Sequence, residues 1–163
     1  MEKIELFRAY FTDEIDYYEN QLKKYEKDGI CSFNFWAGFF GMTWFVYRRM
    51  YVQTFVIAVV LFIFAIISAM FLQIFNPNDS SNETYNFVII YILSFVILGF
   101  IGNASYMKKS IKIVDRFSNR YGLENIDQSL KKSLKKQGGI DFISAIIFVV
   151  GMSIFQAIIK YLL

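Results

Sequence analysis

Residues 50–78 read MYVQTFVIAVVLFIFAIISAMFLQIFNPN, a run without one charged side chain. An α-helix rises about 1.5 Å per residue, so roughly 17 to 25 apolar residues cross the hydrocarbon core of a bilayer. Residues 84–107 and 142–159 are also uncharged and long enough. The sequence therefore predicts an all-α membrane protein with three transmembrane helices, at about 52–75, 86–107 and 142–161.

The composition supports this interpretation and excludes several kinds of chemistry. Hydrophobic residues make up 56% of the 163-residue chain, more than a soluble fold of this size buries. There is no histidine and one cysteine, Cys31, so one chain cannot build a Cys/His metal cluster, a disulfide or a histidine-based triad. No paired carboxylates or glycine-rich phosphate loops occur at suitable spacing. We expect no enzymatic activity, no catalytic residues, no cofactor and no bound metal.

The basic residues predict the topology. Residues 1–49 hold seven Lys and Arg and residues 108–141 hold nine, whereas the predicted external loop, residues 76–85, holds none and only Lys160 falls on the other side. Segments rich in Lys and Arg stay in the cytoplasm. The N-terminus lacks the apolar core of a signal peptide, so the first span must direct insertion. We therefore expect a cytoplasmic N-terminus, a basic cytoplasmic helical loop at 108–141 and an external C-terminus.

Residues 29–49 are harder to place because 29–47 carry no charge. Arg48, Arg49 and the first span follow directly, which leaves no residues for a turn between two spanning helices. We expect an interfacial or re-entrant helix, or a simple aromatic belt that leads into the first span. On a helical wheel Phe33, Trp36, Phe40, Trp44 and Tyr47 share one face, and Asn34, Ala37, Gly38 and Gly41 share another. The expected interfacial anchors are Trp36, Trp44, Tyr47, Arg48 and Arg49.

Residues 1–28 form the predicted cytoplasmic amphipathic helix, continuous from residue 3 to a C-cap at Gly29. Its apolar stripe either packs within the chain or pairs with a partner helix. The stripe consists of Ile4, Phe7, Phe11, Ile15, Tyr18, Leu22 and Tyr25.

The basic loop is predicted to hold two helices. One continues from the second span to Gly122, and the other runs from an N-cap at Asp127 to Gln137. The second carries four candidate contacts to anionic lipids, although a solvated face of a small cytoplasmic domain is the alternative. No aromatic side chains alternate with these lysines, so nucleic acid is not expected. The four are Lys131, Lys132, Lys135 and Lys136.

A family resemblance rests on three elements. Residues 32–50, SFNFWAGFFGMTWFVYRRM, follow the pattern Asn-Trp, Ala, Phe-Phe, Gly, Trp, Tyr-Arg-Lys-Met, with small departures at Phe35-Trp36 and at Arg49. Residues 99–106, GFIGNASY, with Lys108-Lys109, and residues 136–139, KQGG, follow in order. This arrangement resembles a family of small bacterial membrane proteins known as domain of unknown function 2628. The resemblance implies a bacterial inner-membrane protein and supplies no activity.

Two of these elements are expected to touch. Gly99, Gly102, Asn103 and Tyr106 share a face of the second span, at the depth of the face formed by Asn34, Gly38 and Gly41. Small residues let helices approach, and a buried Asn needs a partner. Asn34, Asn103 and Tyr106 either hold the helices together or line a small polar cavity.

Three functions are consistent with these features. The leading hypothesis is a non-enzymatic interaction, regulatory or immunity-type subunit that docks a membrane or cytoplasmic protein through its cytoplasmic face. One alternative is a homo-oligomeric channel, and the other is a lipid-headgroup-handling protein that uses the basic loop. No Asp, Glu, Lys or Arg lies within the uncharged runs 50–78, 84–107 and 142–159, which disfavours proton-coupled transport. The channel candidates are Asn103, Gln53, Gln73 and Gln156.

Overall fold

The computed structural model describes residues 3–75, 81–123 and 127–162, and the regular structure within these ranges is entirely helical. Three helices, α5, α6 and α8, are long and apolar enough to cross a membrane. The bounds are α1 Lys3–Phe11, α2 Ile15–Asp28, α3 Phe35–Phe40, α4 Met42–Tyr47, α5 Tyr51–Phe75, α6 Asn82–Tyr121, α7 Gln128–Gln137 and α8 Phe142–Leu162.

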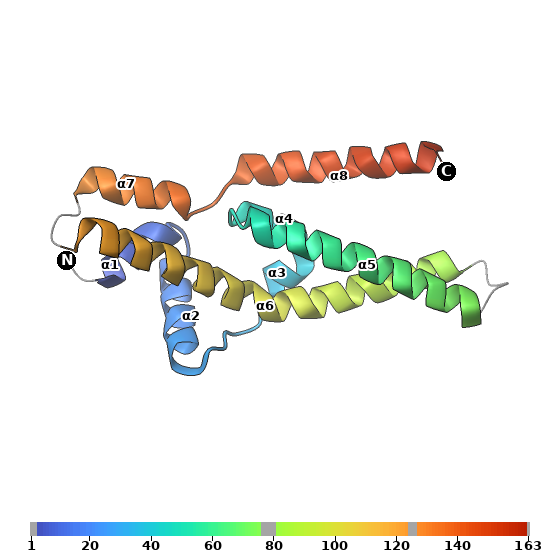
Figure 1. The fold of residues 1–163 in the computed structure, drawn as a ribbon, viewed down its shortest axis with the longest axis horizontal. Helices are drawn as coiled ribbons and strands as arrows, with labels where there is room; N and C mark the ends of the chain where they lie inside the picture. Colours follow the sequence, from blue (N-terminus) through green and yellow to red (C-terminus); the bar gives the residue numbers. More distant parts are fainter. Residues whose placement is uncertain (1–2, 76–80, 124–126, 163) are drawn as a thin grey trace.

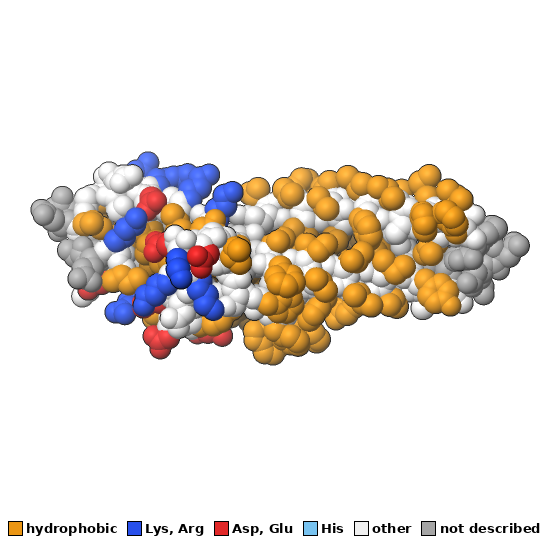
Figure 2. Space-filling model, turned by 90° about the horizontal axis from the view of Figure 1, so that it is seen from below, with side chains coloured by type: hydrophobic (Ala, Val, Ile, Leu, Met, Phe, Trp, Pro, Cys, Tyr) orange, Lys and Arg blue, Asp and Glu red, His pale blue; other side chains and the backbone are white. Residues whose placement is uncertain are grey.

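The molecule is elongated, with one charged end and one apolar end. The apolar half of α6 packs along α5, and its second half continues among α1, α2 and α7 (Figure 1). Figure 2 shows the charged side chains gathered at this end and hydrophobic side chains over the rest of the visible face. The N-terminus lies at the charged end, and the C-terminus lies at the opposite end of the long axis.

Several predicted boundaries agree with the structure. The second span and its extension form one 40-residue helix, α6, which ends before Gly122. The Asp127 side chain accepts a hydrogen bond from the N–H of Leu130 at 2.8 Å, so it caps α7 as expected. Gly29 caps α2 in the left-handed conformation. In the predicted loop 76–85, α6 already begins at Asn82, and residues 76–80 lie outside the described ranges.

The prediction of one continuous helix from residue 3 to residue 28 is wrong. The chain breaks between α1 and α2, where Thr12 and Glu14 have φ values of 60° and 50°. The bend has a packing cause: Phe11 before it and Tyr18 after it both contact the ring of Tyr106 on α6, and all three side chains are buried. The stripe therefore covers the protein's own core, as the intramolecular alternative predicted.

The predicted aromatic helix over residues 29–47 is also broken. Its parts, α3 and α4, meet at Gly41, whose φ of 54° and ψ of −132° suit a residue without a side chain. We call residues 34–47 the helical hairpin. Because of the bend, the five aromatic residues do not share one face: Trp36 and Phe40 are exposed, whereas Trp44 is buried.

Helix α8 packs against α4 near its start, where Ala145 is buried. Farther along, every side chain of residues 149–158 is exposed. Gly151 has no neighbouring atom within 4 Å of the position a Cβ would take. Among the described side chains of α8, only Ala145 is therefore buried, with Ser144 and Phe148 half-buried.

Candidate functional site

The hairpin docks on α6 through close backbone contacts. The Asn34 N–H donates a hydrogen bond to the Gly99 carbonyl at 2.8 Å. A Cβ at Gly38 would lie 2.6 Å from the Phe95 carbonyl oxygen, and one at Gly102 would lie 2.5 Å from the Cβ of Ala37. Both distances are too short for a side chain, so these two glycines are required by packing. At Gly41 the requirement is the backbone conformation instead.

The predicted contact between Asn34 and Asn103 is present. Asn34 Nδ2 donates to Asn103 Oδ1 at 2.8 Å, and Asn34 Oδ1 accepts from the N–H of Ala37 at 2.8 Å. Asn103 Nδ2 donates to the Tyr17 hydroxyl at 2.7 Å and to the Ser32 carbonyl at 2.9 Å. Both asparagines are buried and bonded at both amide ends. This geometry favours helix packing over a polar cavity, and it makes the channel assignment of Asn103 wrong, because the side chain is enclosed within one chain.

Two of the expected interfacial anchors face the protein interior. The Arg48 side chain is 3% exposed, and its Nη2 lies 3.1 Å from Glu14 Oε2. Its guanidinium lies 4.7 Å from the centre of the Tyr18 ring and 5.5 Å from that of Tyr106. Tyrosine rings attract a cation through their π-faces and here take the place of water. Trp44 fills the space above Gly102 and packs on Tyr106, so neither side chain is a membrane anchor.

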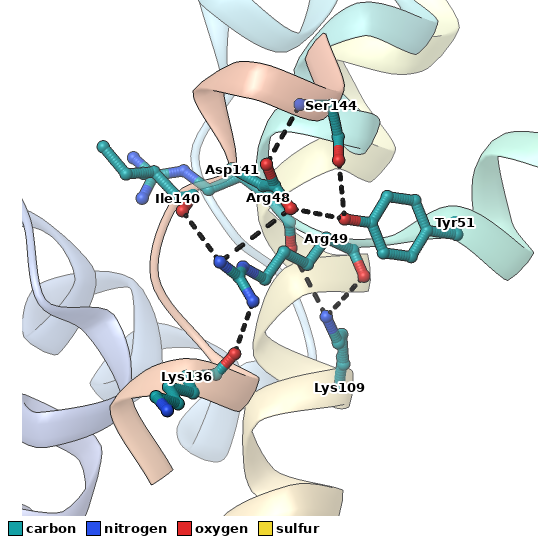
Figure 3. Close-up of polar contacts among 8 residues, drawn as sticks. All are labelled: Arg48, Arg49, Tyr51, Lys109, Lys136, Ile140, Asp141 and Ser144. Carbon is teal, nitrogen blue, oxygen red and sulfur yellow. Dashed lines mark hydrogen bonds and ion pairs between the residues drawn. The ribbon is translucent and has the colours of Figure 1, made fainter. Parts of the chain in front are cut away.

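Arg49 joins the hairpin to the start of α8 (Figure 3). Its Nη1 donates to the Lys136 carbonyl at 2.6 Å and its Nη2 to the Ile140 carbonyl at 3.4 Å, with Asp141 at 3.8 Å. The Asp141 N–H donates to the Tyr47 carbonyl at 2.8 Å. Arg49 is therefore a connector between two segments about ninety residues apart. No local pattern indicates this role, since tandem arginines before a span are typical of headgroup contacts.

Lys109 links α6 to the short segment between α4 and α5. Its Nζ donates to the carbonyls of Arg49 at 2.9 Å and Arg48 at 3.3 Å. These carbonyls follow the end of α4, where the helix leaves acceptors without an internal partner. Burial, and then the nearby charge of Arg49, lower the pKa of Lys109 to about 8. A negative group placed beside Lys109 would favour its charged form.

A basic groove lies between the start of α5 and the adjoining part of α6, with a cavity volume of about 610 Å³. Five of its ten lining side chains are cationic, and none of the ten is acidic. Among the described residues, ion pairs are formed by Arg49 but not by Lys108, Lys112 or Arg116. The groove is lined by Arg49, Tyr51, Val52, Gln53, Ser105, Lys108, Lys109, Lys112, Ile113 and Arg116.

The lysines of α7, the predicted lipid contacts, lie elsewhere. Lys131 pairs with Glu5 on α1 at 3.4 Å, whereas Lys132, Lys135 and Lys136 are exposed. Helix α7 packs on α1 with Leu134 buried, and it runs along the long axis of the molecule, as α8 does (Figure 1). A helix lying flat on a membrane would run across that axis instead. Only the C-terminal turn of α7 is near the end of the molecule that holds the apolar helices (Figure 1).

Other reactive groups have structural explanations. Cys31 is buried, its Sγ lies 3.7 Å from the Gln21 carbonyl, and burial raises the pKa of the thiol. A raised pKa leaves little of the nucleophilic thiolate. No group of three acidic or thiol side chains in the described ranges has the geometry to hold a metal ion.

Residues 2–111 match the family described as protein of unknown function (DUF2628), and this match includes more than half of the chain. The chain belongs to this family. The matched region contains the hairpin, both asparagines, both arginines and the first part of the basic groove, whereas α7 and α8 follow it. No curated protein and no solved structure matches the chain. The predicted family resemblance is confirmed, and the description of the family names no activity.

Proposed function

We propose that this protein is a non-enzymatic membrane protein that binds the phosphate-bearing headgroups of anionic lipids in its basic groove. The observation that carries the proposal is the groove lining, with five cationic side chains and no acidic one. In this proposal the charged end lies at the cytoplasmic face of a bacterial inner membrane, because Lys and Arg are retained on that side.

The groove suits a lipid better than a free anion because of where it lies. It is formed by the start of α5 and the adjoining part of α6, and the next residues along both helices toward the apolar end present exposed apolar side chains, among them Phe55 and Ile101. A phosphate could bind the lysines while acyl chains follow these surfaces. Each basic residue near an anionic membrane contributes roughly 1 kcal/mol, so several together give substantial affinity.

The two other hypotheses receive less support. The channel hypothesis is disfavoured because the Asn103 side chain, one of its candidate lining residues, is fully enclosed within one chain. Docking through the N-terminal stripe is disfavoured because Phe7, Phe11 and Tyr18 are buried internally. The interaction-subunit hypothesis retains one supporting feature, the exposed residues 149–158 of α8, against which another membrane protein could pack.

Native mass spectrometry of the detergent-purified protein tests the proposal. We expect more retained phosphatidylglycerol than phosphatidylcholine of the same chains. The triple variant Lys108→Gln, Lys112→Gln, Arg116→Gln should lose about tenfold or more in phosphatidylglycerol affinity, as expected from a few kcal/mol of lost attraction. Lys109 stays unchanged because it also binds backbone carbonyls.

The matched control removes three charges from α7, in Lys132→Gln, Lys135→Gln, Lys136→Gln. It should retain phosphatidylglycerol as the unmodified protein does, since those side chains are exposed and outside the groove. Equal losses in both triple variants would mean that net charge alone attracts the lipid. A loss in the α7 variant only would place the lipid contacts on α7. Either result would refute the groove.

A further inference from the structure

A second feature, independent of the basic groove, is a slot between the hairpin and α8. Its upper part is a cavity of about 370 Å³ at the charged end, lined by side chains that include Asp13, Glu14, Trp36 and Tyr47. Its lower part is a groove of about 330 Å³ between the apolar helices. Phe40 and Thr43 line both parts, so the two adjoin each other. None of the lining residues of the basic groove belongs to the slot.

The charges in the upper part favour a cation. Arg48 lines it, but its guanidinium is already paired with Glu14 and covered by tyrosine rings. Asp13 is exposed; its Oδ1 accepts the N–H of Glu14 at 3.1 Å, and it has no ion pair with a described residue. Only Nη2 of Arg48 makes this pair, and its Nε and Nη1 are buried without a hydrogen-bond partner among the described residues. Two carboxylates against one guanidinium leave a net negative charge.

The aromatic lining favours the same kind of ligand. Trp36 and Phe40 stack with their ring centres 5.8 Å apart, and about half of each side chain is exposed. Aromatic faces attract ammonium groups. A carboxylate can in addition accept a hydrogen bond from a primary ammonium but not from a quaternary one, which has no N–H. The upper part therefore matches a primary amine best.

The lower part is lined mainly by apolar side chains, with Thr43, Ser94, Ser153 and Gln156 as polar members of the lining. On α8 its lining continues from that of the upper part through Ala145, Phe148 and Met152, at steps of three and four residues along one helix face. Leu61 of α5 and Leu98 of α6 lie on the opposite side. A ligand that fills both parts carries a cationic head and an apolar tail.

We propose that this slot binds a lipid with a primary ammonium headgroup, with the amine beside Asp13 and an acyl chain between the hairpin and α8. The proposal does not depend on the function proposed for the basic groove, because the two sites share no residue. It also explains why α8 stands apart from α5 and α6 along its apolar length: the lipid occupies the space between them.

Native mass spectrometry in detergent, with phosphatidylethanolamine, phosphatidylcholine and phosphatidylglycerol of identical chains, tests the slot. Asp13→Asn should weaken phosphatidylethanolamine binding about tenfold, the effect of losing one charge-assisted hydrogen bond. The amide keeps an oxygen for the Glu14 N–H, so the turn is preserved. Met152→Trp, which places a large ring at a partly exposed position in the lower part, should reduce the same binding. Neither variant should change phosphatidylglycerol binding at the basic groove.

The control is Asp16→Asn, which removes the same charge from an exposed position on α2 outside the slot. It should bind phosphatidylethanolamine as the unmodified protein does. The slot is refuted if Asp13→Asn and Asp16→Asn behave alike, or if Met152→Trp has no effect. Equal binding of phosphatidylcholine and phosphatidylethanolamine would refute recognition of a primary amine. Loss of lipid binding only in the Lys108, Lys112 and Arg116 variant would leave the basic groove supported and the slot refuted.

Discussion

At the scale of single residues, two buried asparagines and the glycines beside them hold the hairpin on α6. An asparagine within an apolar run needs a hydrogen-bonding partner, and small residues on one helix face invite close approach. These two rules were enough to predict the contact between Asn34 and Asn103. The burial of Arg48 was not predictable, because it depends on Tyr18 and Tyr106, which lie far from it in the sequence. No local pattern indicates that three such distant side chains will meet.

The glycine contacts lead to a residue-scale prediction. Gly102→Leu should prevent the hairpin from docking, because even a Cβ there would lie 2.5 Å from Ala37. Forcing extra atoms into a packed site costs about 1–3 kcal/mol or more. We expect a lower yield of monodisperse protein and a lower thermal-unfolding midpoint. The control is Gly151→Leu, which adds the same side chain where no atom lies within 4 Å. Similar losses in both variants would show that leucine harms any apolar helix of this protein.

At the scale of helices and their connections, local sequence predicts where some helices end, but it does not predict the breaks after Phe11 and at Gly41. Asp127 and Gly29 cap helices through their own side chain or backbone, which local sequence reveals. The break after Phe11 and the bend at Gly41 arise because segments on either side pack against α6. Tertiary contacts of this kind override a continuous periodic pattern. Relative to α6, the hairpin reaches Phe95, about 20 Å before Lys108, which favours the re-entrant over the interfacial alternative.

The connection made by Arg49 leads to an element-scale prediction. Arg49→Gln should loosen α8, because the substitution removes the bonds to the Lys136 and Ile140 carbonyls. Each charge-assisted bond contributes about 1.5–3 kcal/mol when buried, and less here because the side chain is one-third exposed. Electron–electron distance measurements between spin labels at Phe87 and Ile154, in a Cys31→Ser background, should show a broader distribution.

The control for this measurement is Arg120→Gln, which removes an exposed arginine on α6 that forms no ion pair with a described residue. Its distance distribution should match that of the unsubstituted background. An unchanged distribution in Arg49→Gln would show that α8 is held by its contacts with α4 alone.

At the scale of the whole molecule, hydrophobicity predicted the number of long helices but not their spacing. Helix α5 carries no charged residue and α8 carries only Lys160 near its end, and both are strongly apolar, so neither pattern indicates which one packs tightly on α6. In a bilayer the hydrophobic effect does not drive such helices together, and close packing depends on small residues and on specific contacts. Gly99 and Gly102 are such small residues where the hairpin docks, whereas Gly151 of α8 has no neighbouring atom within 4 Å of the position a Cβ would take. The slot follows from this difference.

The separation of charge along the molecule predicts how the protein is oriented in the membrane. Three spans place the two termini on opposite sides, and residues 1–49 and 108–141 contain all Lys and Arg except Lys160. Because basic segments stay in the cytoplasm, the N-terminus and the basic groove should lie there and the C-terminus outside. A reporter that is active only in the cytoplasm should therefore be silent when fused after Leu163 and active when fused after Gly122. A periplasm-specific reporter at the same two positions should give the opposite pattern. Cytoplasmic activity at both positions would mean that α8 does not cross the membrane. The slot would then have no bilayer beside it, whereas the basic groove between the start of α5 and the adjoining part of α6 would remain.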